Sequence, residues 1–188
     1  LPLAVLGLGK LGGGSLDYES DLDLVLVYEE IPNINTEIGT FFAKAVEIFI
    51  NALSGFTRDG NLYRVDLRLR PDGKNGKTSI EKNAFFDYLK NRAAVWELLA
   101  YVKLRAVGGD LELAKSVETE ARKIIYENAG NSNKIELKSE TLRIRERLKA
   151  EKTRRKNEID IKFGEGGMLD VYFAVRYLQL RDNLPDTD

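Results

Sequence analysis

The sequence contains neither cysteine nor histidine. Without cysteine the chain forms no disulfide and offers no thiolate to a metal ion, and without histidine it lacks imidazole ligands and the commonest general base. Any catalysis by this chain therefore depends on carboxylates, lysine, arginine, hydroxyl groups and bound metal ions.

An excess of charge of one sign is also missing, because 29 Lys and Arg residues face 30 Asp and Glu residues. A general nucleic-acid-binding protein usually carries a strongly basic surface, so the charge balance disfavours a bulk DNA or RNA partner. Basic residues do gather between positions 143 and 156, but Glu140, Glu146 and Glu151 accompany them. This mixture favours a solvated helix face over an RNA-binding surface.

Long hydrophobic runs are absent, since none approaches the roughly 20 apolar residues that span a bilayer. The opening run LPLAVLGLG has neither the basic start nor the cleavage site of a secretory signal. We therefore expect a soluble, cytoplasmic protein without a membrane partner. Because the first residue is Leu1, we interpret the chain as a fragment whose parent carries further domains.

The apolar pattern of the first hundred residues predicts alternating strands and helices. Apolar runs over residues 3–8 and 22–28 predict two buried strands. Residues 38–53 carry apolar side chains at helical spacing, and Gly55 ends that helix. The segment NLYRVDLRLRP, residues 61–71, alternates apolar and polar side chains, which predicts a strand with one polar face.

The remainder of the sequence is predicted to be helical. Residues 85–107 indicate mainly helix up to Gly108, with Trp96 predicted as a core residue because it lies among apolar side chains. Beyond that point Asp110 is expected to cap one helix, a charged helix follows to about residue 156, and residues 167–180 suggest a third. The sequence thus predicts an α/β (α+β) domain over residues 1–108 and a helical domain over residues 109–188.

The segment GLGKLG, residues 7–12, matches the G-x-G-x-x-G pattern of dinucleotide-binding turns. A dinucleotide fold places an acidic residue at the far end of the next strand, roughly 20 residues on. Here Asp21 and Asp23 arrive too soon and stand at the start of the next strand. The dinucleotide interpretation is therefore disfavoured.

Asp21 and Asp23 instead suggest a metal site that binds a nucleotide. Residues two apart in a strand share a face and lie about 6.5 to 7 Å apart, so both carboxylates can reach one pair of divalent ions. The glycine turn before them offers backbone N–H groups, and Lys10 a point charge, to a triphosphate. Asp66, on the polar face of a later strand, is the best candidate for a third carboxylate. The alternative is that Asp21 and Asp23 only form a solvated strand entry.

Two further features leave alternatives open. Arg68 and Arg70 can hold phosphate groups, because the guanidinium fork matches phosphate oxygens, or they can form surface ion pairs. The segment GEGG, residues 164–167, can cradle an anion at the N-terminus of the next helix or simply begin that helix.

Four segments, in order, carry a family resemblance: GLGKLGGGSLDYESDLDLVLVY, YRVDLRLRPDGKNG, WELLAYVKLRAVGGD and IDIKFGEGGMLDVYFAVRYLQL. Together they resemble the adenylyltransferases and deadenylylases of glutamine synthetase, within the polymerase β nucleotidyltransferase superfamily. That family carries two related catalytic domains, one attaching AMP to a tyrosine of glutamine synthetase and one removing it by phosphorolysis. The chain resembles one of these domains over nearly its whole length.

The resemblance implies a polymerase β-like domain with a mixed sheet, followed by a helical bundle. It implies transfer of AMP between ATP, or phosphate in the reverse reaction, and a tyrosine hydroxyl of glutamine synthetase, with two Mg²⁺ or Mn²⁺ ions. The catalytic and metal-binding residues would be Asp21, Asp23 and Asp66. The residues expected to hold the nucleotide are Gly9, Lys10, Gly12, Gly13, Ser20, Arg68 and Arg70.

One position departs from the family pattern, which usually reads Asp-x-Glu-Phe where this chain has Asp170, Val171, Tyr172 and Phe173. An acid-dependent role at position 172 is therefore in doubt. Two other functions remain as alternatives: a nucleotidyltransferase of the same superfamily acting on another hydroxyl substrate, and a non-catalytic nucleotide-binding regulatory module. The presence of all three acidic residues argues against the second.

Overall fold

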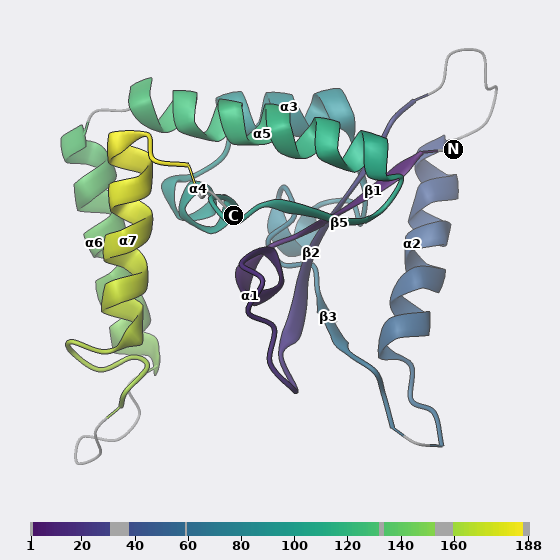
Figure 1. Ribbon diagram of the computed structural model, residues 1–188, viewed down its shortest axis with the longest axis horizontal. Coiled ribbons are helices and arrows are strands. Elements are labelled where there is room, and N and C mark those ends of the chain that lie inside the picture. The colour runs from purple at the N-terminus through teal and green to yellow at the C-terminus, as the bar shows by residue number, and fades with distance from the viewer. Residues whose placement is uncertain (1, 31–37, 59, 132–133, 153–159, 186–188) are drawn as a thin grey trace. The chain divides into compact units, whose positions relative to one another are not determined.

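The computed structural model describes most of the chain, and its contacts divide it into two compact units (Figure 1). The described residues are 2–30, 38–58, 60–131, 134–152 and 160–185. The first unit comprises Leu1–Ala93 and Lys103–Ile124, and the second comprises Ala94–Val102 and Ile125–Asp188. The predicted boundary between residues 108 and 109 stays a prediction.

The first unit is built on a mixed five-stranded sheet, as the resemblance implied. Strand β1 pairs antiparallel with β2 on one side and with β5 on the other, whereas β3 and β4 run parallel to β2 along its remaining edge. The strands are β1 (Leu3–Gly7), β2 (Asp21–Tyr28), β3 (Arg64–Asp66), β4 (Ile80–Glu81) and β5 (Arg105–Gly109).

Strand β2 separates an apolar face from the face that carries the acidic residues. Leu22, Leu24 and Leu26 are buried in one cluster with Val46 of helix α2 (Ile38–Ser54). Because successive side chains of a strand point to opposite faces, the odd-numbered side chains of β2 lie on the other side of the sheet. Packing of α2 therefore fixes the direction in which the acidic residues of β2 point.

Short helices complete the first unit. The glycine segment turns into α1 (Gly9–Gly12), as predicted, and α3 (Lys82–Asn91) begins where the Glu81 carboxylate accepts the Ala84 N–H at 2.9 Å. A 3₁₀ turn, η1, spans Gly73–Asn75. The predicted end of α2 at Gly55 is confirmed, because the Gly55 N–H donates to the Asn51 carbonyl at 2.8 Å.

Two predicted elements were wrong in extent. The strand predicted over residues 61–71 is ordered as a strand only in β3, because the chain turns where the Arg70 N–H donates to the Leu67 carbonyl at 3.1 Å. The helix predicted over residues 85–107 ends early, since residues 105–109 form β5 against the otherwise open edge of β1. Pairing with a strand a hundred positions away overrides the local helical pattern.

The second unit is helical. Helix α4 (Val95–Tyr101) packs against α6 (Lys134–Lys152) and α7 (Met168–Asp182), and α6 and α7 pack on each other. Helix α5 (Leu111–Asn131) belongs to the first unit up to Ile124 and to the second beyond it, and its predicted cap is confirmed by the Asp110 carboxylate, which accepts the Leu113 N–H at 3.0 Å. The three helices predicted after residue 109 are thus present, while their status as a separate bundle domain stays a prediction.

The prediction for Trp96 was wrong, because its side chain is 43% exposed. Helix α4 is only seven residues long and buries Leu98, Leu99 and Tyr101 instead. No helix in the described ranges is long and apolar enough to cross a membrane. The turn predicted at Pro32 and the end of the charged helix beyond residue 152 lie outside the described residues.

Candidate active site

The parallel pairing of β2 and β3 gathers three carboxylates on one face of the sheet. Asp66 lies directly opposite Asp23, and Arg64 lies opposite Asp21. Val65 packs into the apolar cluster beneath the sheet, so its neighbours Arg64 and Asp66 point to the opposite face. The structure thus brings together the three acidic residues that the sequence singled out.

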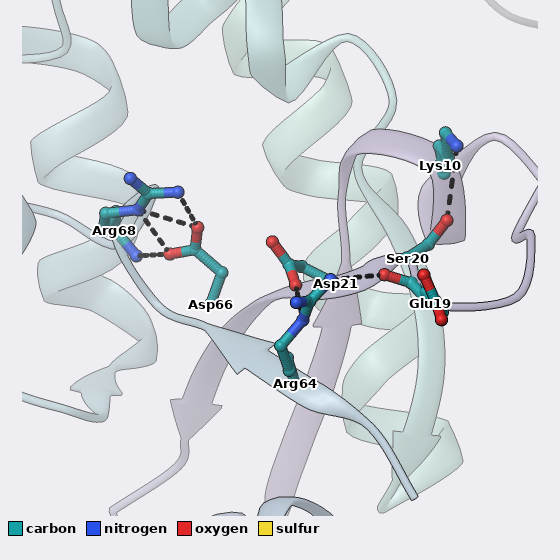
Figure 2. Close-up of polar contacts among 7 residues, drawn as sticks. All are labelled: Lys10, Glu19, Ser20, Asp21, Arg64, Asp66 and Arg68. Atoms are coloured by element: carbon teal, nitrogen blue, oxygen red, sulfur yellow. Dashed lines mark hydrogen bonds and ion pairs between the residues drawn. The ribbon is translucent and has the colours of Figure 1, made fainter.

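Two of these carboxylates are held by arginines (Figure 2). The Arg64 Nε donates to Asp21 Oδ1 at 2.8 Å, and its Nη2 donates to the Glu19 carbonyl at 2.7 Å. Arg68 donates to Asp66 through its side chain, with Nε 2.7 Å from Oδ2, and through its backbone N–H, 2.8 Å from Oδ1. The importance of Arg64 was missed, since only its place opposite Asp21 in the sheet reveals it.

The three acidic residues differ in their electrostatics. Burial, together with the charges of Asp66 and Asp21, raises the pKa of Asp23 from 3.8 to about 6, although Arg68 opposes this. Burial also acts to raise the pKa of Asp66, but hydrogen bonds from Arg68 and the charges of Arg68 and Lys74 outweigh it, so that pKa lies below its ordinary value. The centre of the cluster therefore carries uncompensated negative charge, which a cation would relieve.

Glycine is required at two positions of the turn before the acidic residues. Gly9 has a φ of +55°, and a Cβ atom there would lie 2.2 Å from Asp23 Oδ2. A Cβ atom on Gly12 would lie 2.1 Å from the Lys103 carbonyl oxygen. These glycines let the turn pack directly against the Asp23 carboxylate and the chain before β5.

Basic residues lie on two sides of this glycine turn. Lys10 Nζ is 2.8 Å from Asp17 Oδ2 and 3.3 Å from Ser20 Oγ, so it joins the turn to the loop that precedes β2. The Lys103 side chain covers Gly13, where a Cβ atom would lie 2.2 Å from Lys103 Nζ. Lys103 was missed as a candidate, although it lies in the third segment of the family resemblance.

Arg70 is not part of this group. Its side chain donates to three backbone carbonyls, those of Leu67 at 2.8 Å, Lys74 at 3.0 Å and Gly76 at 3.1 Å. The guanidinium is therefore used to fix the turn that follows β3. Of the two arginines considered for phosphate binding, only Arg68 lies beside the acidic cluster. Arg70 stabilises the turn that follows β3.

A cavity of about 740 Å³ lies in the first unit, and Arg64, the partner of Asp21, is one of its lining residues. Its walls come from the loop before β2 and the loop before β3, and they include Tyr18, Leu62, Tyr63 and Arg64. Tyr18 and Leu62 are largely exposed. The volume falls within the range of sites that bind small molecules.

The acidic residues suit a divalent cation chemically. Carboxylate oxygens are the ligands that Mg²⁺ and Mn²⁺ prefer, and the negative charge around Asp23 favours a cation. Within the described ranges, however, no three acidic side chains converge as ligands of one ion. Oxygens of Asp21 and Asp66 accept hydrogen bonds from Arg64 and Arg68, so a cation bound by all three acids would compete with these arginines.

The glycine segment of residues 164–167 in the second unit begins helix α7. The Asp170 carboxylate accepts the Gly166 N–H at 2.6 Å and also binds Arg145, whose Nη2 donates to the carbonyls of Phe163 and Gly164 at 3.0 Å each. The hydrogen bond from Arg145 lowers the pKa of Asp170. This internal capping favours a plain helix entry over an anion site.

The charged helix α6 is not solvated on all sides. Arg143 pairs with Glu140 at 2.7 Å and Arg147 with Glu151 at 2.8 Å on the surface, as predicted. Arg145 is buried, however, with its side chain only 7% exposed. The prediction of a solvated face was wrong at this residue because its partner lies 25 positions later in the sequence.

Tyr172, at the position where the family usually has an acidic residue, contacts Arg176. The Arg176 guanidinium carbon is 5.5 Å from the centre of the Tyr172 ring, a cation–π contact one helical turn away. An acidic residue at this position would lie at the spacing for an ion pair with the same arginine. The aromatic ring can therefore replace an acidic side chain as the partner of Arg176.

Comparison with known proteins identifies the family of this chain. A family model described as glutamate-ammonia ligase adenylyltransferase matches residues 1–120. A bifunctional glutamine synthetase adenylyltransferase/adenylyl-removing enzyme of Idiomarina loihiensis is 34% identical over 186 residues, which cover 96% of this chain and 19% of that relative. The chain therefore spans about a fifth of the length of this curated relative. On this evidence the chain belongs to the glutamate-ammonia ligase adenylyltransferase family.

Proposed function

We propose that this chain transfers AMP between ATP and a tyrosine hydroxyl of glutamine synthetase, or releases it from that tyrosine to phosphate. Membership of the family supports the reaction class, and the name of the relative supports both directions. The observation that carries the proposal is the pairing of β2 with β3, which places Asp66 beside Asp23. We assign this chemistry to residues 1–108.

The proposed reaction is an in-line displacement at the α-phosphorus. The tyrosine oxygen forms a bond to that phosphorus, the bond to the oxygen of the β-phosphate breaks, and pyrophosphate leaves. The hydroxyl proton passes to the Asp66 carboxylate. In the removal reaction an oxygen of inorganic phosphate forms a bond to the phosphorus of the AMP group, and the bond from that phosphorus to the tyrosine oxygen breaks. The tyrosine oxygen takes up the proton that the phosphate loses, so ADP and free tyrosine are formed. Holding the reacting groups in line is the main contribution of the protein.

The residues of the cluster have separate roles in this proposal. Asp21 and Asp23 would hold two divalent ions, and Asp66 would hold one of them. When bound, such ions neutralise phosphate charge and favour ionisation of the attacking hydroxyl. We assign the proton to Asp66 because the sheet register sets it beside Asp23. Its lowered pKa makes it a weaker base while Arg68 is bound, so release of Arg68 would favour this role.

The proposed nucleotide site includes the glycine turn. Gly9, Gly12 and Gly13 belong to it because they let the turn pack against Asp23 and Lys103, next to the acidic cluster. Lys10 Nζ and Ser20 Oγ lie 3.3 Å apart where the turn meets the loop before β2. The cavity lined by Ser20 and Arg64 would supply space for a bulky group near this site.

The proposal is tested by incubating the chain with unmodified glutamine synthetase plus Mg²⁺ and ATP, and with adenylylated glutamine synthetase plus Mg²⁺ and phosphate. Mass spectrometry of the tyrosine-bearing peptide then reports gain or loss of AMP. We expect one of the two changes with the wild-type chain and neither with Asp23→Asn. If both forms of glutamine synthetase stay unchanged while ATP is bound, the substrate or the activity is wrong.

One observation favours the alternative of a non-catalytic nucleotide-binding module. Asp21 and Asp66 are both paired with arginines, an arrangement that also suits a chain that never binds two ions. ATP binding that is independent of Mg²⁺ and of Asp23, without turnover, would support this alternative. AMP transfer to another hydroxyl compound would instead indicate a different substrate for the same chemistry.

A further inference from the structure

We propose that Arg64 and Arg68 have two successive partners: the carboxylates of Asp21 and Asp66 in the metal-free chain, and the phosphates of the nucleotide once a divalent cation binds those carboxylates. The inference rests on the proposed function and deepens it. It assigns to Arg64 the binding of a nucleotide phosphate, a role that the sequence alone does not indicate.

The first part follows from competition for the same oxygen atoms. Arg64 Nε is 2.8 Å from Asp21 Oδ1, and Arg68 Nε is 3.0 Å from one Asp66 oxygen and 2.7 Å from the other. Arg68 engages both oxygens of Asp66, whereas Arg64 engages only Oδ1 of Asp21. A cation at these oxygens competes with the guanidinium groups for lone pairs and repels them by its charge. Cation binding by Asp21 and Asp66 therefore displaces the arginine side chains at least in part.

The second part follows from the exposure of the arginines. The side chains of Arg64 and Arg68 are 66% and 67% exposed, so little packing holds either guanidinium in place. Arg70, by contrast, is half-buried and tied to three carbonyls. Arg64 and Arg68 can thus change partner without disturbing the core, whereas Arg70 cannot.

Charge balance identifies the second partner. In the metal-free chain the arginines offset two of the three negative charges of the cluster. When cations take over this neutralisation, two guanidinium groups are left near the site with no anion bound. A triphosphate brings new negative charge to this place, and its oxygens match the planar guanidinium fork. The arginines would therefore weaken metal binding in the free chain, and binding of metal and binding of triphosphate would each favour the other.

The first measurement is the affinity for Mn²⁺ in the absence of nucleotide. Electron paramagnetic resonance reports the concentration of free Mn²⁺ during the titration. The variants are Arg64→Ala and Arg68→Ala, and Lys44→Ala is the control because it removes one charge from an exposed ion pair with Glu47 on α2. Loss of a competing partner should tighten Mn²⁺ binding about twofold to fivefold in each arginine variant. The control should match the wild type.

The second measurement is binding of α,β-methylene-ATP at saturating Mn²⁺. Here the same arginine variants should bind about tenfold more weakly, since each loses a charge-assisted contact with phosphate. Arg64→Lys and Arg68→Lys keep the charge and should recover part of this affinity. Thermal unfolding without metal verifies that each variant is folded.

Opposite signs in the two measurements support the inference. Unchanged or weaker Mn²⁺ binding in both arginine variants would overturn it, and so would unchanged affinity for α,β-methylene-ATP. Failure of the proposed function gives a different result: the wild-type chain itself would bind no Mn²⁺, or Asp23→Asn would leave Mn²⁺ binding unaltered. In that case both the proposed function and this inference fall.

Discussion

Among the arginine–aspartate pairs of the described residues, Arg68–Asp66 and Arg145–Asp170 have the same chemistry and opposite surroundings. In the first unit, Asp66 has only 13% of its side chain exposed while its partner Arg68 extends into solvent. In the second unit the arginine is the covered partner: Arg145 lies beneath α7 and also binds two carbonyls, while Asp170 is partly exposed. In the first pair the arginine side chain is exposed, and in the second pair it is buried and held by several partners.

This difference distinguishes an ion pair that can take part in chemistry from one that stabilises the fold. A carboxylate held at a sheet surface by an exposed arginine can exchange that arginine for another cation, because only side-chain hydrogen bonds are lost. A buried arginine cannot leave in this way, because its departure leaves a carboxylate and backbone carbonyls without their hydrogen-bond donor. We therefore expect changes at the first pair and its neighbours to alter chemistry, and changes at the second to alter stability.

The largest effect is expected on catalysis from Asp23→Asn. Removal of this carboxylate should lower AMP transfer about a thousandfold, the loss typical of a group that stabilises charge in the transition state. The circular dichroism spectrum should be unchanged because Asp23 lies outside the apolar cluster beneath the sheet. Retention of most of the activity would show that the site lies elsewhere.

Arg145→Ala should produce the largest loss of stability. We expect the free energy of unfolding to fall by about 3 kcal/mol, because a buried guanidinium with several partners is removed. Arg143→Ala, two residues earlier and exposed, is the matched control and should change it by less than about 0.5 kcal/mol. Urea denaturation of both variants makes the comparison. Equal effects would mean that Arg145 is no more structural than its exposed neighbour.

A smaller effect concerns the pH dependence of the metal-free chain. The pKa of Asp23 is raised to about 6, so folding favours its protonated form, and its contribution to stability is lost as the pH rises through 6. The shift from 3.8 corresponds to at most about 3 kcal/mol, which partial exposure of the carboxyl reduces to about 1 kcal/mol.

Asp23→Asn should therefore be more stable than the wild type by about this 1 kcal/mol at pH 7, and the advantage should shrink towards pH 4. Urea denaturation in the presence of a chelator, at a series of pH values, measures the difference. An advantage that is the same at every pH would show that charge repulsion among the carboxylates is not its cause.

The smallest effect is expected from Lys10→Ala. Lys10 offers one exposed charge at the glycine turn, so its loss should raise the KM for ATP about fivefold and lower kcat less. Steady-state kinetics at several ATP concentrations separates the two parameters. An unchanged KM would place Lys10 outside the phosphate site.

Much of the first unit could be predicted from its sequence because local patterns control it. The period of two in β2 places Asp21 and Asp23 on one face, and the glycines before them mark the turn. That Asp66 joins them is a matter of strand pairing, which the pattern of β3 allows but does not determine. Its place on a polar strand face suggested Asp66, the family resemblance implied the same residue, and the sheet register agrees with both.

The features that were missed depend on contacts between distant residues. Arg145 resembles its exposed neighbours in sequence and is buried only because Asp170 and the carbonyls before α7 cover it. β5 was predicted as helix because nothing in its sequence shows the open edge of β1. Arg64 was missed because only the register of the two strands sets it against Asp21.

The most direct test of the central claim is single-turnover AMP transfer by Asp66→Asn, measured together with its affinity for ATP in Mg²⁺. If Asp66 serves the tyrosine hydroxyl, whose ordinary pKa is about 10, the transfer step should be severely slowed while ATP still binds through Asp21 and Asp23. Normal transfer would remove Asp66 from the site. Loss of ATP binding would contradict its assignment to the nucleophile and make it a ligand for the nucleotide's ion.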